Sequence, residues 1–354
     1  MRYRLLLMVS LLLSVQLLSA KTQVSGQLIN DASQVLQGGV SEGFSRRTFA
    51  NLGLEYSFSE NTSVYAGAQL LRGDNGSDDV GDIQAYSNID EAEFNRIYEV
   101  WLQHHFSDIG LRIKLGQVDA NNEFAFVLHS TEFLNSSMGV SPTIAELPTY
   151  PLPRMSLNLH WQTDNRNTVS TGIYSDQSNE FADLFNIGQW THEFDKATLM
   201  LGAWYKSGGV VPAYALLDSI DNLPTTSAEG YYAGAWGDFP YLLFGAARAG
   251  WFSQIAYSSP SISSVSKHLG AGVQWYDTHG ETGNIAGVGL SHIVTSNRLH
   301  NTLAKNETAL EIFYRWQLNK HIALKPDLQY IIGPAAKPAA DNAWIVTLRT
   351  EFTF

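Results

Sequence analysis

The sequence has 354 residues, a formal net charge of −12 and no cysteine. The lack of cysteine excludes a disulfide framework, a catalytic thiolate and a cysteine-ligated zinc site. The acidic balance argues against nucleic acid as a partner, because nucleic-acid-binding proteins carry clustered basic residues. Aromatic residues are plentiful, with 9 Trp, 16 Tyr and 17 Phe, and a membrane barrel uses many of these at its two interfaces.

The first twenty residues have the pattern of a secretory signal. Arg2 and Arg4 precede a largely apolar run from Leu5 to Leu18, and the small residues Ser19 and Ala20 follow. The run falls short of the ~20 apolar residues that a spanning helix needs, so a cleaved signal is favoured over a membrane anchor. We predict a signal peptide over 1–20, cleavage after Ala20 and one mature domain over 21–354.

Short turns alternate with longer polar connections along the rest of the chain. The seven short turns are expected at 59–61, 107–108, 164–166, 195–196, 238–240, 278–283 and 319–320. The eight longer connections are expected near 36–43, 73–92, 119–152, 176–183, 207–228, 258–263, 295–305 and 332–341. The period-two alternation between them is weakest in the first strand, near Val24–Val35, and in the two strands between 229 and 257.

Fifteen such connections join sixteen strands. Bacterial outer-membrane barrels have an even number of strands, short periplasmic turns and longer outer loops. We therefore predict an all-β fold: a transmembrane antiparallel β-barrel of sixteen strands in the outer membrane of a Gram-negative bacterium, with both termini periplasmic. A barrel of this size leaves an aqueous lumen rather than a packed interior.

The connection 74–82 is acidic and suggests a cation site. It contains Asp74, Asp78, Asp79 and Asp82, and carboxylates are ligands that Ca²⁺ prefers. The spacing lacks the full EF-hand pattern, including its terminal glutamate, so a solvated outer loop is the favoured interpretation. We expect no metal and no cofactor.

The connection 119–152 is out of scale with the others. Loops of this length without elements of their own are usually functional. We predict that it folds into the lumen as a constriction loop, in preference to a long external loop.

The last three segments show the clearest strand pattern. In the final segment Trp344, Val346, Leu348, Thr350, Phe352 and Phe354 form one face, and Ala343, Ile345, Thr347, Arg349, Glu351 and Thr353 form the other. Period two with one apolar face is typical of a strand. The segments 307–317 and 321–331 repeat it across a tight hairpin. Pro326 has no backbone N–H, so it must lie where a hydrogen bond between neighbouring strands can be missing. A final strand ending in Phe354 resembles the sorting signal that the barrel-assembly machinery reads.

Six blocks of residues resemble the carbohydrate-selective porin family, often called OprB-like. They are Tyr98–Trp101, Leu115–Phe124, Phe133–Gly139, Tyr150–Leu152, Glu307–Glu311 and Lys325–Ile331, in the order in which the family has them. The chain departs from the family at Gly333-Pro334-Ala335-Ala336, where Asn-Pro-Gly-Gly is usual, and it is shorter than typical members. The resemblance implies a sixteen-stranded outer-membrane porin that passes mono- or oligosaccharides by facilitated diffusion.

A sugar pore needs hydrogen-bond donors and acceptors along its wall, because a sugar sheds water only if its hydroxyls are bonded again. Aromatic faces can also stack on the apolar side of a pyranose. Strand parity and the start of the long loop give the candidate pore-lining residues Glu93, Glu99, Trp101, Arg112, Lys114, Asp119, Asn122, Glu123, Phe124, Phe126, Arg154, Glu311, Arg315 and Arg349.

Some of these residues can instead stabilise the barrel or its long loop without contacting solute. Glu311, Arg315 and Arg349 either contact solute or brace the wall by cross-strand pairing. For Asn122, Glu123 and Phe124 an anchor between loop and wall is favoured over solute contact. Trp101 points inward by parity, but a slip of one residue would turn it to lipid.

Other functions remain as alternatives. The main one is a general or anion-selective porin without sugar preference, and a soluble periplasmic β-protein is another. An outer-membrane enzyme such as a lipid hydrolase is disfavoured: His104 points outward, but no serine can be assigned to it, and the Gly-x-Ser-x-Gly, His-Glu-x-x-His and P-loop motifs do not occur. We expect carbohydrate solutes, outer-membrane lipid and lipopolysaccharide as partners, and a monomer or homotrimer.

Overall fold

The computed structural model describes residues 21–144, 146–176, 180–213, 215 and 224–354. The predicted signal peptide, 1–20, lies outside the described residues. No helix in the described part of the chain has the length and apolar character to cross a membrane.

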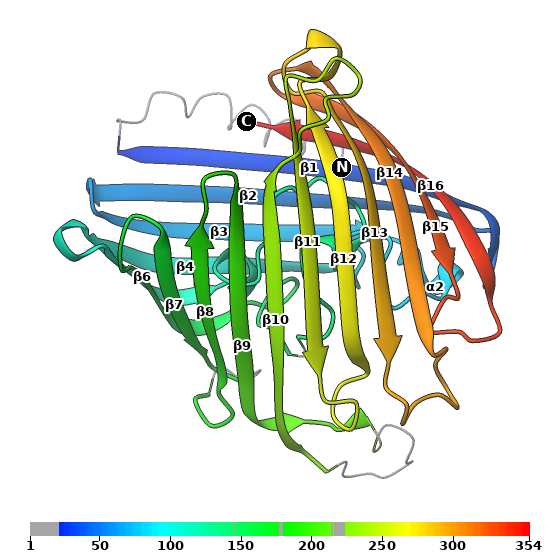
Figure 1. Cartoon of the computed structure of the whole chain (residues 1–354), viewed down its shortest axis with the longest axis horizontal. Helices are drawn as coiled ribbons and strands as arrows, with labels where there is room; N and C mark the ends of the chain where they lie inside the picture. The colour runs from blue at the N-terminus through cyan, green and yellow to red at the C-terminus, as the bar shows by residue number, and fades with distance from the viewer. Residues whose placement is uncertain (1–20, 145, 177–179, 214, 216–223) are drawn as a thin grey trace.

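Sixteen strands in the described residues form one closed antiparallel barrel, in which each strand pairs with its chain neighbours and β1 pairs with β16 (Figure 1). Strands of the two opposite walls cross in this view, as the tilt that closes a barrel requires. The strands are β1 (Thr22–Gly39), β2 (Phe44–Ser59), β3 (Thr62–Gly73), β4 (Phe94–Phe106), β5 (Leu111–Val118), β6 (Arg154–Gln162), β7 (Asn167–Tyr174), β8 (Phe185–Glu193), β9 (Ala197–Val210), β10 (Thr226–Asp238), β11 (Arg248–Ser258), β12 (Val265–Tyr276), β13 (Ile285–Thr295), β14 (Asn306–Asn319), β15 (Ile322–Ile332) and β16 (Asp341–Thr353).

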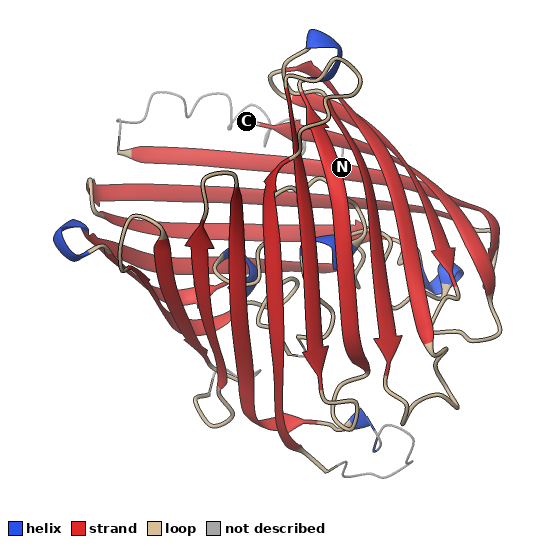
Figure 2. Cartoon of the chain, viewed as in Figure 1, coloured by secondary structure: helices blue, strands red, loops and turns tan. Residues whose placement is uncertain are grey.

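The predicted barrel of sixteen strands is therefore confirmed, and the predicted connections fall between the strands in the expected alternation. One connection differs: the link between β10 and β11 covers 239–247, where a turn at 238–240 was expected. In the described part of the chain, five short helices lie in connections: α2 (Ser77–Val80), η2 (Ser107–Ile109), η3 (Ala120–Asn122), α3 (Ser136–Gly139) and η5 (Thr278–Gly280). Figure 2 shows several of these helices and their loops between the two walls of the barrel.

The alternating pattern of the last strands produces two distinct faces. On β16, Arg349 and Thr347 are buried toward the lumen, whereas Leu348 is 47% exposed on the outside. On β14, Glu311 and Phe313 are buried, whereas Ile312 between them is exposed. Apolar side chains thus face outward and polar ones face inward, the pattern of a barrel that spans a membrane.

Pro326 occupies a gap in the ladder. It pairs with Leu348 of β16 on one side. On the other side, the pairing between β14 and β15 passes from Phe313–Asp327 to Trp316–Leu324, without a pair for Pro326. The strand therefore tolerates a residue that has no N–H to donate.

The barrel closes at its last residue. The Phe354 N–H donates to the Gly26 carbonyl and the Gly26 N–H donates to the Phe354 carbonyl, both at 3.1 Å. The Phe354 ring covers Gly26 so closely that a Cβ at position 26 would lie 2.0 Å from a ring carbon. Glycine at position 26 therefore makes room for the terminal ring.

We predict that deletion of Phe354 lowers the yield of assembled barrel, because the closing bonds to β1 and the terminal aromatic are lost together. The fraction that migrates as a heat-modifiable band on a gel measures this yield. Phe352→Ala, which keeps the terminal phenylalanine, is the control and should assemble better than the deletion. Normal membrane levels of the truncated chain under strong expression would contradict a role for Phe354 in assembly.

Candidate functional site

Glu123 lies at the centre of a charged cluster between the long loop and the wall. It follows η3, which Asp119 caps by accepting the Asn121 N–H at 2.8 Å. Its carboxylate accepts from Arg112 Nη2 at 2.8 Å and from Lys114 Nζ at 2.5 Å, both on β5. Nε2 of His160 on β6 lies 2.8 Å from the same carboxylate. Charge-assisted bonds of this length are the strong ones, so the cluster fixes the start of the loop to the wall.

The pKa of the Glu123 carboxyl reflects these contacts. Burial alone would raise the pKa, but the hydrogen bond with His160 and the charges of Lys114 and Arg112 lower it to about 2. A lowered carboxyl pKa means that the anchor contributes its stability above the ordinary carboxyl range. That contribution is lost progressively as the pH falls from the ordinary carboxyl pKa of 4.5 to about 2.

A bulge in β4 places two residues side by side under the start of the loop. Gly67 of β3 pairs with Glu99, but the next residue, Ala68, pairs with Ile97. Tyr98 is the extra residue, and both Tyr98 and Glu99 are buried toward the lumen. The Tyr98 hydroxyl donates to the Asp119 carboxylate, and the Glu99 carboxylate accepts the Asp119 N–H at 2.9 Å.

The same loop, 119–153, is bonded to strands on the far side of the barrel. Glu311 of β14 accepts the N–H groups of Leu134 and Asn135 at 2.6 and 3.0 Å. Nε2 of Gln254 on β11 donates to the carbonyls of Ser137 and Met138. Nζ of Lys325 on β15 donates to the Glu132 carboxylate at 2.7 Å. The loop thus contacts the inner face of β11, β14 and β15 as well as β5 and β6.

The loop 74–93 is held in the same manner. Nε and Nη2 of Arg349 bind the two carboxylate oxygens of Asp31 at 2.8 Å each, and Nη2 also donates to Asn88 Oδ1 at 2.9 Å. Glu307 accepts the N–H groups of Ile83 and Gln84 at 3.0 Å. The two loops also bond to each other, because the Asn88 N–H donates to the Leu134 carbonyl and the Ser136 N–H to the Ala85 carbonyl.

The prediction of a solvated loop at 74–82 is wrong for its second half. Asp74 and Asp78 are exposed, but Val80, Gly81 and Asp82 are buried. Burial and the nearby Glu307 raise the pKa of Asp82 well above its ordinary value. The inward bonds of residues 83–88 pull this segment into the barrel. Among the described residues, no group of three or more His, Cys, Asp or Glu side chains is arranged to hold a metal ion.

The structure places the predicted residues in several environments. Arg112, Lys114 and Glu123 come together, with Lys114 Nζ 4.2 Å from the centre of the Trp101 ring. Asn122 Nδ2 donates to Glu99 at 3.4 Å. Phe124 is fully buried and stacks on His160, so it packs the loop rather than facing solute, whereas Phe126 is exposed. Arg154 begins β6 at the loop end of the barrel.

From the sequence, Glu311, Arg315 and Arg349 were expected either to contact solute or to brace the wall, and in the structure all three make contacts within the protein. Arg315 Nε donates to Glu351 at 2.9 Å, two strands away. Arg349 pairs with Asp31, its direct neighbour in the β1–β16 register. Glu311 and Arg349 also hold loops, a function that cross-strand pairing alone does not predict.

The placement of Glu93 on a wall strand is wrong. Glu93 precedes β4, is exposed at the rim, and accepts the Gly73 N–H at 2.9 Å. Counting alternate residues back from Glu99 had placed Glu93 on the inner face. The count fails because Tyr98 is an extra residue at the bulge, so inward and outward positions are exchanged in the residues before it.

Several residues of the site were missed by sequence reasoning. His160 and Glu132 carry no motif, and their partners are distant in sequence. Tyr98 stands in the family-like block Tyr98–Trp101, but strand parity counted from Glu99 turned it outward. Asp31 was missed because the first strand was located only approximately. Glu351 lay on the inward face of the last strand by parity, and Glu307 stood in the family-like block Glu307–Glu311.

A stacked aromatic pair lies on the inner wall beside the Glu123 cluster. The rings of Tyr65 on β3 and Trp101 on β4 have centroids 5.2 Å apart and planes inclined by 17°. Gly53 and Gly67 leave room for Tyr65, since a Cβ at either would lie within 2.8 Å of its ring or hydroxyl. Both rings are half-buried, so the wall carries aromatic surface next to charged donors and acceptors.

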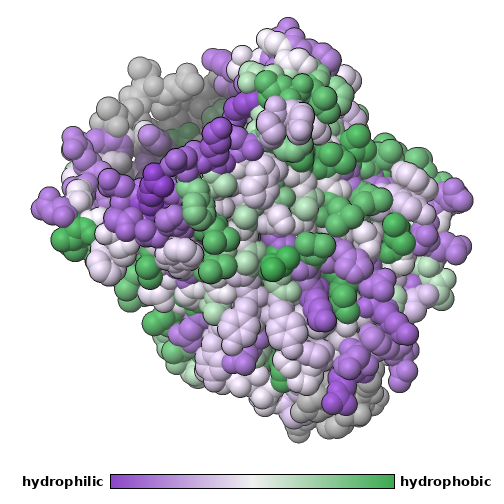
Figure 3. Space-filling model, in the orientation of Figure 1, coloured by the Kyte–Doolittle hydropathy of each residue, from purple (hydrophilic) through white to green (hydrophobic). Residues whose placement is uncertain are grey.

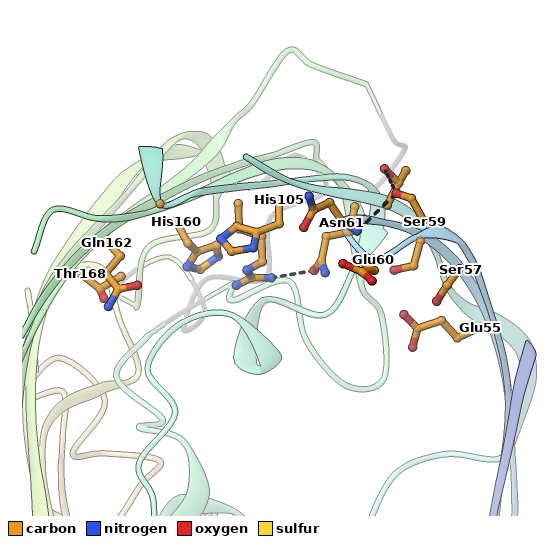
Figure 4. Close-up of a pocket in the computed structure, with 14 residues that line it drawn as sticks. Glu55, Ser57, Ser59, Glu60, Asn61, His105, His160, Gln162 and Thr168 are labelled. Atoms are coloured by element: carbon orange, nitrogen blue, oxygen red, sulfur yellow. Dashed lines mark hydrogen bonds between the residues drawn. The ribbon is translucent and has the colours of Figure 1, made fainter. Parts of the chain in front are cut away.

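A polar cavity of about 400 Å³ opens at the short-turn end of the barrel, next to the Glu123 cluster. Figure 4 shows Glu55, Asn61, His105 and His160 along its wall. Arg112 and His160 belong to both the cavity and the Glu123 cluster, and Arg112 Nη1 donates to Gln103 Oε1 at 3.1 Å. The lining offers both donors and acceptors, which suits a solute rich in hydroxyl groups.

We predict that the Glu123 anchor causes no change in single-channel conductance between pH 7 and pH 4 in planar bilayers, because the Glu123 carboxyl remains ionised over this range. Glu123→Gln should loosen the loop already at pH 7, since removing one partner of a buried ion pair costs about 3–5 kcal/mol. Increased current noise is the expected readout. A conductance step between pH 4 and 5 in the native protein that Glu123→Gln abolishes would contradict this assignment.

Comparisons with known proteins agree with this geometry. The structure superimposes on the high-pH structure of Pseudomonas putida OprB with a TM-score of 0.82, at 14% identity over 94% of each chain. It also resembles the outer-membrane channel DcaP of Acinetobacter baumannii, with a TM-score of 0.59 at 9% identity over 94% of this chain and 97% of that one. A loop-deletion mutant of OmpT, an outer-membrane protein of Vibrio cholerae, gives 0.57 at 11% identity over 94% and 99%. These likenesses show the fold.

No curated protein sequence matches the chain. The family model for carbohydrate-selective porins of the OprB family matches residues 54–233 and 243–354. This is most of the barrel, and it includes the blocks at 98–101, 115–124 and 325–331. The chain therefore belongs to the OprB family of carbohydrate-selective porins.

Proposed function

We propose that this protein lets mono- or oligosaccharides diffuse across the outer membrane into the periplasm, and that the loops 74–93 and 119–153 set the width of its pore. The observation that carries the proposal is the attachment of loop 119–153 to both sides of the barrel, at Glu123 and at Glu311. In a wide lumen a solute away from the wall stays hydrated. A loop fixed across the lumen brings donors and acceptors within reach of both sides of a sugar.

The charges of the wall favour a neutral solute over an anion. Lys114, Lys325 and Arg349 each bind a carboxylate at 2.5 to 2.8 Å, and Arg315 does so at 2.9 Å. These cations are therefore neutralised by Glu123, Glu132, Asp31 and Glu351. A sugar, by contrast, uses neutral and paired groups equally well, because its hydroxyls both donate and accept.

The proposal extends to export and assembly. The signal peptide over 1–20 delivers the chain to the periplasm, and the barrel-assembly machinery recognises Phe354. The exposed apolar face then meets lipid and lipopolysaccharide. A monomer and a homotrimer are both compatible with a pore inside each barrel, because the pore does not require a neighbouring copy.

Shortening the loop within 125–147, in a form that still folds, should raise single-channel conductance and flatten the dependence of sugar flux on size, because the far-side attachment at Glu311 is lost. Planar bilayers and liposome swelling with a size series of sugars measure the two effects. Deletion of Asn301 and Thr302 in the rim loop between β13 and β14 is the control. Unchanged conductance and size cutoff in the shortened protein would show that the loop does not set the pore width.

Trp101→Ala should weaken sugar block of the ion current about tenfold, equivalent to ~1.4 kcal/mol of binding free energy, because the pair with Tyr65 presents aromatic surface to the lumen. Val100→Ala changes the neighbouring outward residue and should leave block unchanged. Equal block in both variants would remove the aromatic pair from the sugar path. The current without sugar is the reference for each.

A further inference from the structure

The connection between β10 and β11 is unlike the others at its end of the barrel. It covers 239–247, Phe-Pro-Tyr-Leu-Leu-Phe-Gly-Ala-Ala, and contains no charged residue. Each of the other six short-turn-end connections includes at least one acidic or basic residue. Tyr241, Leu242, Leu243 and Phe244 are between 49% and 69% exposed. A run of four exposed large apolar residues in a water-facing turn is unfavourable unless something covers it.

The turn folds onto the outside of the barrel rather than over the lumen. Trp275 of β12 donates its Nε1–H to the Tyr241 carbonyl at 2.9 Å. The neighbours of Trp275 in the strand, Gln274 and Tyr276, face inward, and the Tyr276 hydroxyl bonds His129 of loop 119–153 at 2.5 Å. Trp275 therefore faces outward, between its register partners Ala249 and Ala286.

Aromatic packing fixes the turn in this position. The rings of Phe239 and Phe244 meet the Trp275 ring edge-on, with centroids 6.3 and 5.7 Å away. The turn has its own backbone bonds: the Ala246 N–H donates to the Leu243 carbonyl, and the His279 N–H of η5 donates to the Phe244 carbonyl. Gly245 supplies the positive φ of +63° at which a side chain would be strained. The four apolar side chains are thus presented outward by a folded turn.

The exposed surface of the turn continues the lipid-facing surface of the barrel. The cluster of Trp275, Ala249 and Ala286 also packs against Tyr314 of β14, next to the exposed outward residue Trp316. The turn stands at the top of the view in Figure 1, and Figure 3 shows apolar surface gathered there. The family match breaks between 233 and 243, so the first half of this turn is not part of the pattern that the family shares.

We propose that the turn 239–247 is a lipid anchor that inserts Tyr241, Leu242, Leu243 and Phe244 into the boundary between headgroups and acyl chains of the periplasmic leaflet. Apolar side chains at this boundary contribute binding free energy in proportion to the area they remove from water. A phospholipid is the occupant that the geometry favours over a periplasmic protein, because the surface is uncharged and continuous with the lipid belt. The inference rests on the outer-membrane location and goes beyond sugar transport.

The native chain has no cysteine, so single cysteines can be labelled cleanly. Leu242→Cys carrying an environment-sensitive fluorophore is reconstituted in vesicles of phosphatidylethanolamine and phosphatidylglycerol, with or without brominated acyl chains. Leu348→Cys, in the lipid-facing row of β16, is the positive control. Asn61→Cys, in the polar turn between β2 and β3, is the aqueous control.

We expect brominated lipid to quench the label at 242 nearly as strongly as at 348, and aqueous iodide to quench mainly the label at 61. A label at 242 that iodide quenches as at 61 would overturn the anchor. A label protected from both quenchers would also overturn it, by showing a protein contact instead of lipid.

A second variant tests the anchor without labels. Replacement of Tyr241, Leu242, Leu243 and Phe244 together by serine should lower the temperature of the heat-modifiable transition in vesicles more than in detergent micelles, while sugar flux stays native. An equal shift in both media would reduce the turn to a packing role and reject the anchor. Loss of sugar selectivity plays no part in this outcome, so the test is independent of the proposed transport function.

Discussion

Charges on the inner wall of the barrel must be paired, and this requirement connects the wall to its loops. Asp31, Glu307, Glu311, Lys325 and Arg349 are all almost fully buried. An isolated charge in such a place is costly, and removing one partner from a buried pair costs about 3–5 kcal/mol. The loops supply the missing partners as backbone N–H groups and as carboxylates. Loop and wall therefore stabilise each other.

This dependence explains how two long loops are held inside a wide barrel. Loop 119–153 is attached at Glu123 near its start and at Glu311 and Lys325 on the opposite wall, and loop 74–93 is attached at Arg349 and Glu307. A loop bonded to two opposite walls has few ways to move, so its backbone is held in one conformation. The same bonds pair Lys114 and Lys325 of the wall with the loop carboxylates of Glu123 and Glu132.

The sequence predicts what depends on local pattern and fails where distant segments meet. Period-two alternation and turn composition were sufficient for the sixteen strands, because each strand pairs with its chain neighbour. The inward segment 83–88 could not be predicted, since its partners at Asp31, Glu307 and Arg349 approach it only when the barrel closes. The turn 239–247 was expected to be shorter because the period-two pattern is weak between 229 and 257, and the packing of Phe239 and Phe244 on Trp275 joins residues that are distant in sequence.

The bulge in β4 shows how one residue decides where the long loop begins. Without it, Tyr98 would face lipid and Glu99 alone would meet the end of β5. With it, Tyr98 and Glu99 lie together and bind the carboxylate and the N–H of Asp119 respectively. Asp119 in turn caps η3, which orients Glu123 toward Lys114 and Arg112. The inserted residue also reverses the alternation before it, so Glu93 falls at the rim. A count of alternate residues is thus reliable only between bulges, and the bulge lies where the loop must be directed inward.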